Sequence, residues 1–208
     1  IVALGSEPVC PNPCFGVCPC TIGNLGVAKF APDKTEPKVS SVEVDMNGSG
    51  KLTVVFSETV TGKSVAPQAL SLQSNANGAQ AQVVALSASA SVTKKSHTTY
   101  EIQPTADDMN KIKAQRKLCI AQASCHVIVS SAFATDTATN TPNKVEAIAN
   151  TKALLVKAFG DDKTSPKLTH FALDMREGEL TLTFDETIDA DEFKVKELTL
   201  QATTSAGA

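Results

Sequence analysis

The sequence predicts an all-β protein built from tandem β-sandwiches, and three observations carry that prediction. Val, Leu, Ala, Thr and Ser dominate the 208 residues, aromatic residues make up 4%, and Trp is absent; this composition is typical of short strands joined by polar loops. Apolar and polar residues alternate along several short segments, as in strands with one buried face. A sequence pattern also recurs along the chain, which indicates a repeated domain.

The charge and hydropathy of the chain exclude several classes of partner. The net charge is −3 and the sequence pI is about 5.6, so neither a nucleic-acid partner nor a polybasic membrane contact is expected. No apolar stretch approaches the roughly 18 residues of a membrane span. The sequence opens at Ile1 without an initiator Met or a signal-peptide pattern, and we interpret it as a mature or excised piece of a precursor.

Residues 1–32 are expected to form a small cysteine-rich segment. Four cysteines, Cys10, Cys14, Cys18 and Cys20, stand in the run CPNPCFGVCPC. Pro and Gly between them disfavour a helix or a strand ladder, so disulfides are the expected stabilising device, as in secreted modules. Their spacing fits a tetrahedral zinc site poorly. Which cysteines pair is left open, because four cysteines allow three pairings.

An internal repeat sets the remaining domain boundaries. The segment DKTEPK at 33–38 recurs as DKTSPK at 162–167, and KLTVVFSETV at 51–60 recurs as ELTLTFDETI at 179–188. LSLQ at 70–73 is matched by LTLQ at 198–201. The prediction is therefore a complete sandwich over 33–158, called copy one, and the first part of a second over 159–208, called copy two.

Each copy is predicted to begin with a β-hairpin. In copy one Leu52, Val54 and Phe56 alternate with polar or smaller residues. Apolar and polar residues also alternate in the segment before the turn Asn-Gly-Ser-Gly at 47–50. Copy two repeats this pattern around the turn Arg-Glu-Gly at 176–178. Gly and Asn at these positions are typical of hairpin turns.

Further strands are expected in copy one near 69–73, 82–88, 98–103, 126–131 and 153–157. With the first hairpin they total about seven, which favours an immunoglobulin-like sandwich. Thr105 and Asp108 form a capping box that starts one short helix, with Met109 and Ile112 on its apolar face. We expect this helix to cross between the two sheets. Cys119 and Cys125 follow it and are expected to form a local disulfide.

These segments resemble a known family. The LTVVFSETV strand at 52–60, ALSLQS at 69–74, TADDMNKIK at 105–113 and ATDTATN at 134–140 are similar to bacterial-type immunoglobulin-like domains of S-layer and other surface proteins. They look more like the tandem repeats of large extracellular proteins of algae and other protists, including flagellar hairs (mastigonemes). The resemblance covers roughly 33–208. It implies an architectural role and carries no catalytic residues to transfer.

Candidate chemical sites are few. His97, His126 and His170 fall in or beside expected strands, without a known catalytic motif nearby. Basic groups at 94–97 and 111–117 are interpreted as a solvated loop and a solvated helix face. The sequence therefore predicts no enzyme activity and no cofactor.

Acidic residues at the boundary of the two copies are the weak candidates for a calcium site, because calcium prefers several carboxylate oxygens. They are Asp161, Asp162, Asp189 and Asp191, with Asp185, Glu186 and Glu192 nearby. Copy one has Ser57, Thr61 and Lys63 at three of the matching positions. This difference favours an ordinary acidic loop over a metal site.

Asn47, in the sequence Asn-Gly-Ser, is the one candidate for N-glycosylation. Its place in a hairpin turn makes attachment sterically feasible in a secreted chain.

The predicted function is that of a structural subunit of an extracellular filament or cell-surface coat, with a flagellar hair as the most concrete version. Its partners would be other copies of itself or other filament subunits. The alternatives are an adhesive or ligand-binding surface module and spacer domains of a larger secreted protein. Copy two, being short, is expected to expose an apolar face, completed either by continuation of the chain or by strands of a neighbouring subunit.

Overall fold

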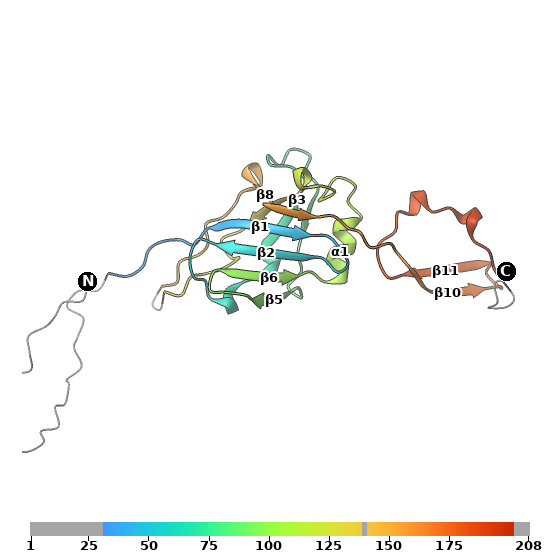
Figure 1. Cartoon of the computed structure of the whole chain (residues 1–208), viewed down its shortest axis with the longest axis horizontal. Helices are drawn as coiled ribbons and strands as arrows, with labels where there is room; N and C mark the ends of the chain where they lie inside the picture. Colours follow the sequence, from blue (N-terminus) through green and yellow to red (C-terminus); the bar gives the residue numbers. More distant parts are fainter. Residues whose placement is uncertain (1–30, 139–140, 202–208) are drawn as a thin grey trace, which may run out of the picture. The chain divides into compact units, whose positions relative to one another are not determined.

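A computed structural model describes residues 31–138 and 141–201 of the chain (Figure 1). The described residues from Lys34 onward belong to one compact unit, and the following description concerns that unit. The predicted disulfides of Cys10, Cys14, Cys18 and Cys20 lie outside the described residues. No helix in the described part of the chain is long and apolar enough to cross a membrane.

Copy one contains a five-stranded sheet with the order β5-β6-β2-β1-β9 (Figure 1). Its strands are β1 (Val39–Asp45), β2 (Lys51–Phe56), β5 (Ser91–Lys94), β6 (Thr99–Gln103) and β9 (Ala158–Gly160). Neighbouring strands are antiparallel, except that β9 runs parallel to β1. The β1–β2 hairpin of the sequence prediction is therefore present, with Val44 opposite Leu52 and Val42 opposite Val54.

A second, four-stranded sheet has the order β4-β3-β7-β8 and is antiparallel throughout. It consists of β3 (Leu70–Gln73), β4 (Val83–Ala85), β7 (His126–Val129) and β8 (Leu154–Leu155). Six 3₁₀ helices occur in the described connections: Gly62–Ser64, Pro67–Ala69, Gln122–Ser124, Asn150–Lys152, Ala190–Glu192 and Val195–Glu197.

One hydrophobic core takes side chains from both sheets, because each sheet turns one alternating set of residues inward. Leu52, Val54 and Phe56 are buried on β2, and Leu70 and Leu72 are buried on β3. Burial of each such side chain stabilises the fold by roughly 1.5–3 kcal/mol. The prediction of an aliphatic, all-β fold is thus confirmed for copy one.

A small aromatic group closes one part of the core. The Phe56 ring lies 6.0 Å from Tyr100, edge to face, and 5.8 Å from Phe133, stacked. The Tyr100 hydroxyl is buried and donates a 2.9 Å hydrogen bond to the carbonyl oxygen of Val60. Its polar end is thereby satisfied without solvent.

The one α-helix of the described residues, α1 (Ala106–Lys113), leaves the five-stranded sheet after β6 and leads toward β7 of the other sheet. Its capping box is the predicted one: the Thr105 hydroxyl accepts from the Asp108 N–H, and the Asp108 carboxylate accepts from the Thr105 N–H. Asp108 also accepts two hydrogen bonds from Ser87, which fix the helix start against the loop after β4. The sequence predicts this helix because its capping box and its apolar residues lie within a few positions of one another.

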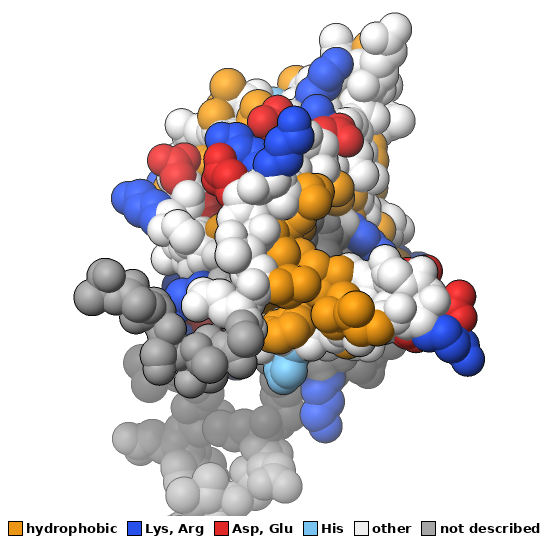
Figure 2. All heavy atoms as spheres, turned by 90° about the vertical axis from the view of Figure 1, so that its right-hand side faces the viewer, with side chains coloured by type: hydrophobic (Ala, Val, Ile, Leu, Met, Phe, Trp, Pro, Cys, Tyr) orange, Lys and Arg blue, Asp and Glu red, His pale blue; other side chains and the backbone are white. Residues whose placement is uncertain are grey.

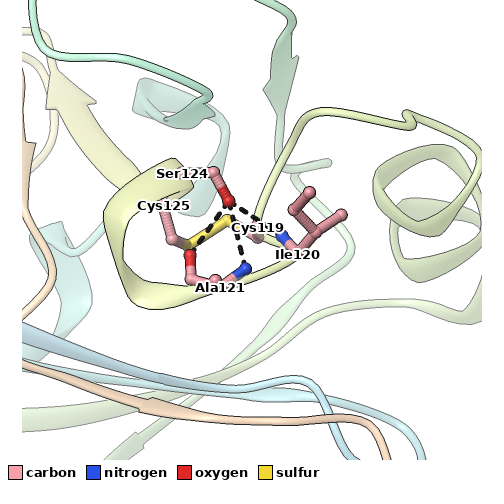
Figure 3. Close-up of a disulfide and its surroundings, with 5 residues drawn as sticks. All are labelled: Cys119, Ile120, Ala121, Ser124 and Cys125. Atoms are coloured by element: carbon pink, nitrogen blue, oxygen red, sulfur yellow. Dashed lines mark hydrogen bonds between the residues drawn. A yellow bond between two sulfur atoms is a disulfide. The ribbon is translucent and has the colours of Figure 1, made fainter.

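Cys119 and Cys125 form a disulfide between the end of the α1 segment and β7 (Figure 3). Ser124 supports the same turn, because its hydroxyl accepts from the N–H groups of Ile120 and Ala121 and donates to the Ala121 carbonyl. This is the pair that the sequence predicts. The bridge closes a short loop, so its effect is local.

The closing turn of copy one is organised by Asp136, which is almost fully buried. Its carboxylate accepts hydrogen bonds from the Asn143 side chain and from the N–H groups of Ala138 and Asn143. Burial pushes the pKa of Asp136 upward, but these hydrogen bonds outweigh it and hold the pKa below its ordinary value.

Copy two is a two-stranded sheet of β10 (Leu168–Asp174) and β11 (Glu179–Phe184). Its register repeats that of copy one, with Leu173 opposite Leu180 and Phe171 opposite Leu182. Both hairpin turns contain a glycine at the matching position with a positive φ, +70° at Gly50 and +71° at Gly178. This backbone conformation favours glycine, which explains why that residue recurs.

Several sequence expectations are corrected. The segment 198–201 was expected to be a strand like β3, but it is not one; β3 is held between β4 and β7, and the described part of copy two has no counterpart of either. Strand β5 was missed, because it is short and mostly exposed. Strand β9 extends the five-stranded sheet of copy one to Gly160.

Candidate functional site: the junction of the two copies

The most elaborate group of charged side chains in the described part of the chain lies where copy two follows copy one. Lys113, the last residue of α1, places its Nζ 2.7 Å from Asp162 Oδ2 and 2.7 Å from Glu186 Oε2. The side chains of Lys113 and Glu186 are only 11% and 12% exposed. One buried ammonium group thus joins the linker after β9 to the turn after β11.

Lys113 and Asp162 each stabilise the charged form of the other. Burial lowers the pKa of Lys113, but hydrogen bonds and charge from Asp162 and Glu186 outweigh it and raise that pKa above its ordinary value. Burial likewise raises the pKa of Asp162, but the hydrogen bonds from Lys113 and the Thr164 N–H, with the charge of Lys113, outweigh it and lower that pKa. Both shifts favour the charged forms of Lys113 and Asp162.

A more exposed ion pair lies beside the buried one. Arg116 contacts the carboxylates of Asp189, at 3.1 Å, and Asp191. Asp189 also accepts from the N–H of Asp191, which caps the 3₁₀ helix Ala190–Glu192. Because these side chains are well exposed, this pair contributes little stability on its own.

Uncharged hydrogen bonds connect the two copies as well. Asn47 Oδ1 accepts from the Lys163 N–H and from the Thr164 hydroxyl, both at 3.0 Å. The Thr187 hydroxyl donates to Asn110 Oδ1 at 2.8 Å. We call Lys113, Asp162, Glu186, Thr187, Asn110 and Asn47 the junction clasp.

The clasp revises two interpretations of the sequence. Lys113 belongs to a stretch interpreted as a solvated helix face, yet it is largely buried between two carboxylates. The acidic turn of copy two was interpreted as an ordinary loop, yet Glu186 is a partner of that lysine. The sequence did hold one indication of a structural role for Glu186, because copy one has a glutamate, Glu58, at the matching position.

The calcium candidates line one side of a cleft of about 690 Å³, together with Lys113, Arg116 and Cys119. Asp162, Asp189 and Asp191 face Lys113 and Arg116, so protein cations already neutralise these carboxylates. Asp161 lines the same cleft. Within 31–138 and 141–201, no group of three His, Cys, Asp or Glu side chains could hold a metal ion.

The glycosylation candidate Asn47 is exposed in the β1–β2 turn. Because its Oδ1 atom already accepts the two bonds of the clasp, a glycan on its nitrogen would lie beside the junction.

The three histidines lie on separate elements. His126 is buried on β7 opposite Gln73, and burial lowers its pKa. His97 is exposed in the β5–β6 turn with Lys94 Nζ 3.4 Å from its Nδ1, and His170 is exposed on β10. This arrangement brings no histidine together with another.

A second candidate site is the apolar face of the β10–β11 hairpin. Phe171 and Met175 are 63% and 81% exposed, whereas their counterparts in copy one, Val42 and Met46, are 0% and 5% exposed. Figure 2, which faces the hairpin side, shows hydrophobic side chains gathered at the surface. A cleft of about 510 Å³ runs along this hairpin, lined in part by Leu168, Phe184 and Phe193.

The fold and these sites define an all-β protein with a repeated domain and a polar junction between its copies. No family model matches the chain, and no curated protein matches it.

Two solved structures show some likeness. One is the N-terminal part of the bacterial S-layer protein SbsC, with 18% identity and a TM-score of 0.36, covering 72% of this chain and 31% of that chain. The other is the S-layer protein rSbsC(31-844), with 19% identity and a TM-score of 0.37, covering 76% of this chain and 18% of that one. The chain thus spans about a third or less of either protein. At these scores the likeness does not by itself establish a shared fold or function.

Proposed function

We propose that the protein is a non-catalytic structural module of an extracellular filament or cell-surface coat. The observation that carries the proposal is the junction clasp, which ties one repeat to the next through a lysine buried between two carboxylates. A chain that only connected independent domains would need no such contact. A fixed angle between repeats is what a filament or coat requires of its subunits.

Copy one is best interpreted as immunoglobulin-like, and its strand order supports this. In that fold one sheet holds strands A, B, E and D and the other holds C, F and G. The order β1-β2-β6-β5 corresponds to A-B-E-D, and the order β4-β3-β7-β8 corresponds to C′-C-F-G. Domains of this kind serve many proteins as spacers and adhesive modules.

The Cys119–Cys125 disulfide supports an extracellular location, because disulfides persist mainly in oxidising compartments. A flagellar hair is the most specific version of this proposal.

Immunogold electron microscopy of the source cells tests the proposal. Antibodies against copy one should label an extracellular filament or coat at a regular spacing, and antibody preabsorbed with the protein should not. Labelling confined to the cell interior would overturn the proposal. Labelling of the surface without periodicity would instead favour an adhesive module or a spacer of a larger protein.

A further inference from the structure

Both copies begin on the same structural frame, in which the entry segment is held against the turn after the second strand. In copy one the Lys38 N–H donates to the Ser57 hydroxyl at 2.9 Å, and in copy two the Lys167 N–H donates to the Asp185 carboxylate at 2.7 Å. The β1–β2 and β10–β11 hairpins also share their register. We call this segment and turn the entry face, which comprises 34–38 and 57–63 in copy one and 163–167 and 185–191 in copy two.

The residues that copy two contributes to the junction clasp have identical counterparts in copy one. The dipeptide Glu-Thr at 186–187 recurs at 58–59, and DKT at 162–164 recurs at 33–35. In the clasp, Glu186 binds the buried ammonium group of Lys113. Because both copies carry this chemistry, the clasp residues by themselves do not distinguish the entry face of one copy from that of the other.

The two copies differ at both positions that contact Arg116. Its guanidinium group donates to the carboxylates of Asp189 and Asp191 in copy two. Copy one has Thr61 and Lys63 at the matching positions. This part of the entry face is therefore negatively charged in copy two and positively charged in copy one.

The backbone presents these side chains in the same way in both copies. A 3₁₀ helix covers Gly62–Ser64 in copy one and Ala190–Glu192 in copy two, and an extended residue precedes each helix. Lys63 and Asp191 stand at the matching central positions of these helices, and both are exposed. A copy one in the place of copy two would therefore bring the ammonium group of Lys63 against the guanidinium group of Arg116.

We propose that Arg116 selects which repeat docks on the α1 end of copy one. Asp189 and Asp191 attract Arg116 and admit copy two, whereas Lys63 repels it and excludes a second copy one. Specificity is a difference between two affinities, so ion pairs that add little stability can still decide between two entry faces that are otherwise alike. Like charges placed against each other are a general means of suppressing a wrong partner.

The order of the repeats then follows from charge. In a filament or coat, the α1 end of one molecule meets the entry faces of other molecules at high local concentration. Repulsion by Lys63 keeps the copy-one entry face of a neighbour from replacing copy two at the junction. This inference rests on the proposed structural function and deepens it, because it names the residues that fix which repeats are joined.

The test gives copy two the entry residues of copy one in the full chain. Asp189→Thr combined with Asp191→Lys should accelerate hydrogen exchange in peptides covering 161–165 and 185–188 by roughly 10-fold, because two attractive contacts are lost and a repulsive one is gained. Asp191→Lys alone keeps the Asp189 carboxylate that caps the 3₁₀ helix, and it should accelerate the same peptides by roughly 5-fold. Both effects should shrink in about 1 M salt, which screens exposed charges.

Reversing the charge of Arg116 gives the decisive result. Arg116→Glu alone should accelerate exchange at the junction by roughly 10-fold, because like charges then face each other. Added to Asp189→Thr and Asp191→Lys, the same substitution should return the rates to within about threefold of the wild-type values, because opposite charges face each other again. Lys117→Glu is the matched control, since Lys117 is exposed but does not line the junction cleft, and it should leave the rates unchanged.

Wild-type exchange in Asp191→Lys would overturn the proposal, and so would a triple variant that exchanges as fast as the chain with the two aspartate substitutions. Equal acceleration by Lys117→Glu would also overturn it, because net charge and not position would then control the junction. Any of these results together with periodic surface labelling would refute this inference and leave the proposed function standing. Intracellular labelling would refute the proposed function whatever the exchange rates are.

Discussion

Replacing Lys113 with Met is expected to open the junction between the copies without unfolding copy one. The methionine keeps most of the apolar length of the side chain but removes the charge, so the carboxylates of Asp162 and Glu186 are left facing each other. Exposed ion pairs contribute about 0–1 kcal/mol, and breaking a buried pair costs about 3–5 kcal/mol. Lys113 is largely buried and one of its partners is partly exposed, so we expect the closed junction to lose about 2 kcal/mol of stability.

A loss of about 2 kcal/mol corresponds to a change of about 30-fold in the equilibrium between closed and open junction. Hydrogen exchange measured by mass spectrometry should therefore accelerate by about that factor in peptides covering 161–165 and 185–188. Peptides from β2 and β6 should keep their wild-type rates, because their hydrogen bonds lie within copy one.

Lys111→Met is the matched control, because Lys111 lies on the same helix and is exposed. It should leave every rate unchanged. Adding Glu186→Gln to Lys113→Met should restore part of the protection, since it removes one of the two facing charges. Wild-type exchange at the junction of Lys113→Met would refute the reasoning, because it would mean that the buried lysine does not hold the copies together.

Three further predictions concern copy one. Replacing both Cys119 and Cys125 with Ser should lower the unfolding free energy by roughly 2–3 kcal/mol, as expected for a short closed loop, and an unchanged thermal midpoint would contradict that. Tyr100→Phe removes a buried hydroxyl and leaves a carbonyl unpaired, so chemical denaturation should show a loss of about 1–2 kcal/mol; no loss would show that the bond contributes nothing. Because the folded-state pKa of Asp136 is depressed, its stabilisation is complete above the ordinary value of about 3.9 and is lost as the pH falls through the lower folded value. An acid titration of stability should therefore be flatter in Asp136→Asn than in the wild-type chain, and identical curves would contradict this.

The parts of the fold that depend on local chemistry were predictable from the sequence. The capping box of Thr105 and Asp108, the hairpin turns and the alternation of Leu52, Val54 and Phe56 each specify their structure within a few residues. The position of Cys119 and Cys125, close together on either side of a turn, also sufficed to predict their disulfide.

The parts that depend on distant partners were not predictable in the same way. LSLQ is a strand and LTLQ is not, although their sequences nearly match. The difference arises because strand structure at this position requires neighbours on both sides. The burial of Lys113 was missed for the same reason, since its partners lie more than forty positions away in the sequence.

The central claim is that the two copies share a hairpin sequence and differ, within the described residues, in what covers it. Hydrogen exchange of the full chain, at a concentration where it is monomeric, tests this most directly by comparing matching peptides. The account predicts slow exchange across β2 (Lys51–Phe56) and fast exchange across β11 (Glu179–Phe184), whose burial differs although their sequences correspond. Equally slow exchange in both strands would show that copy two is self-sufficient and would contradict the account.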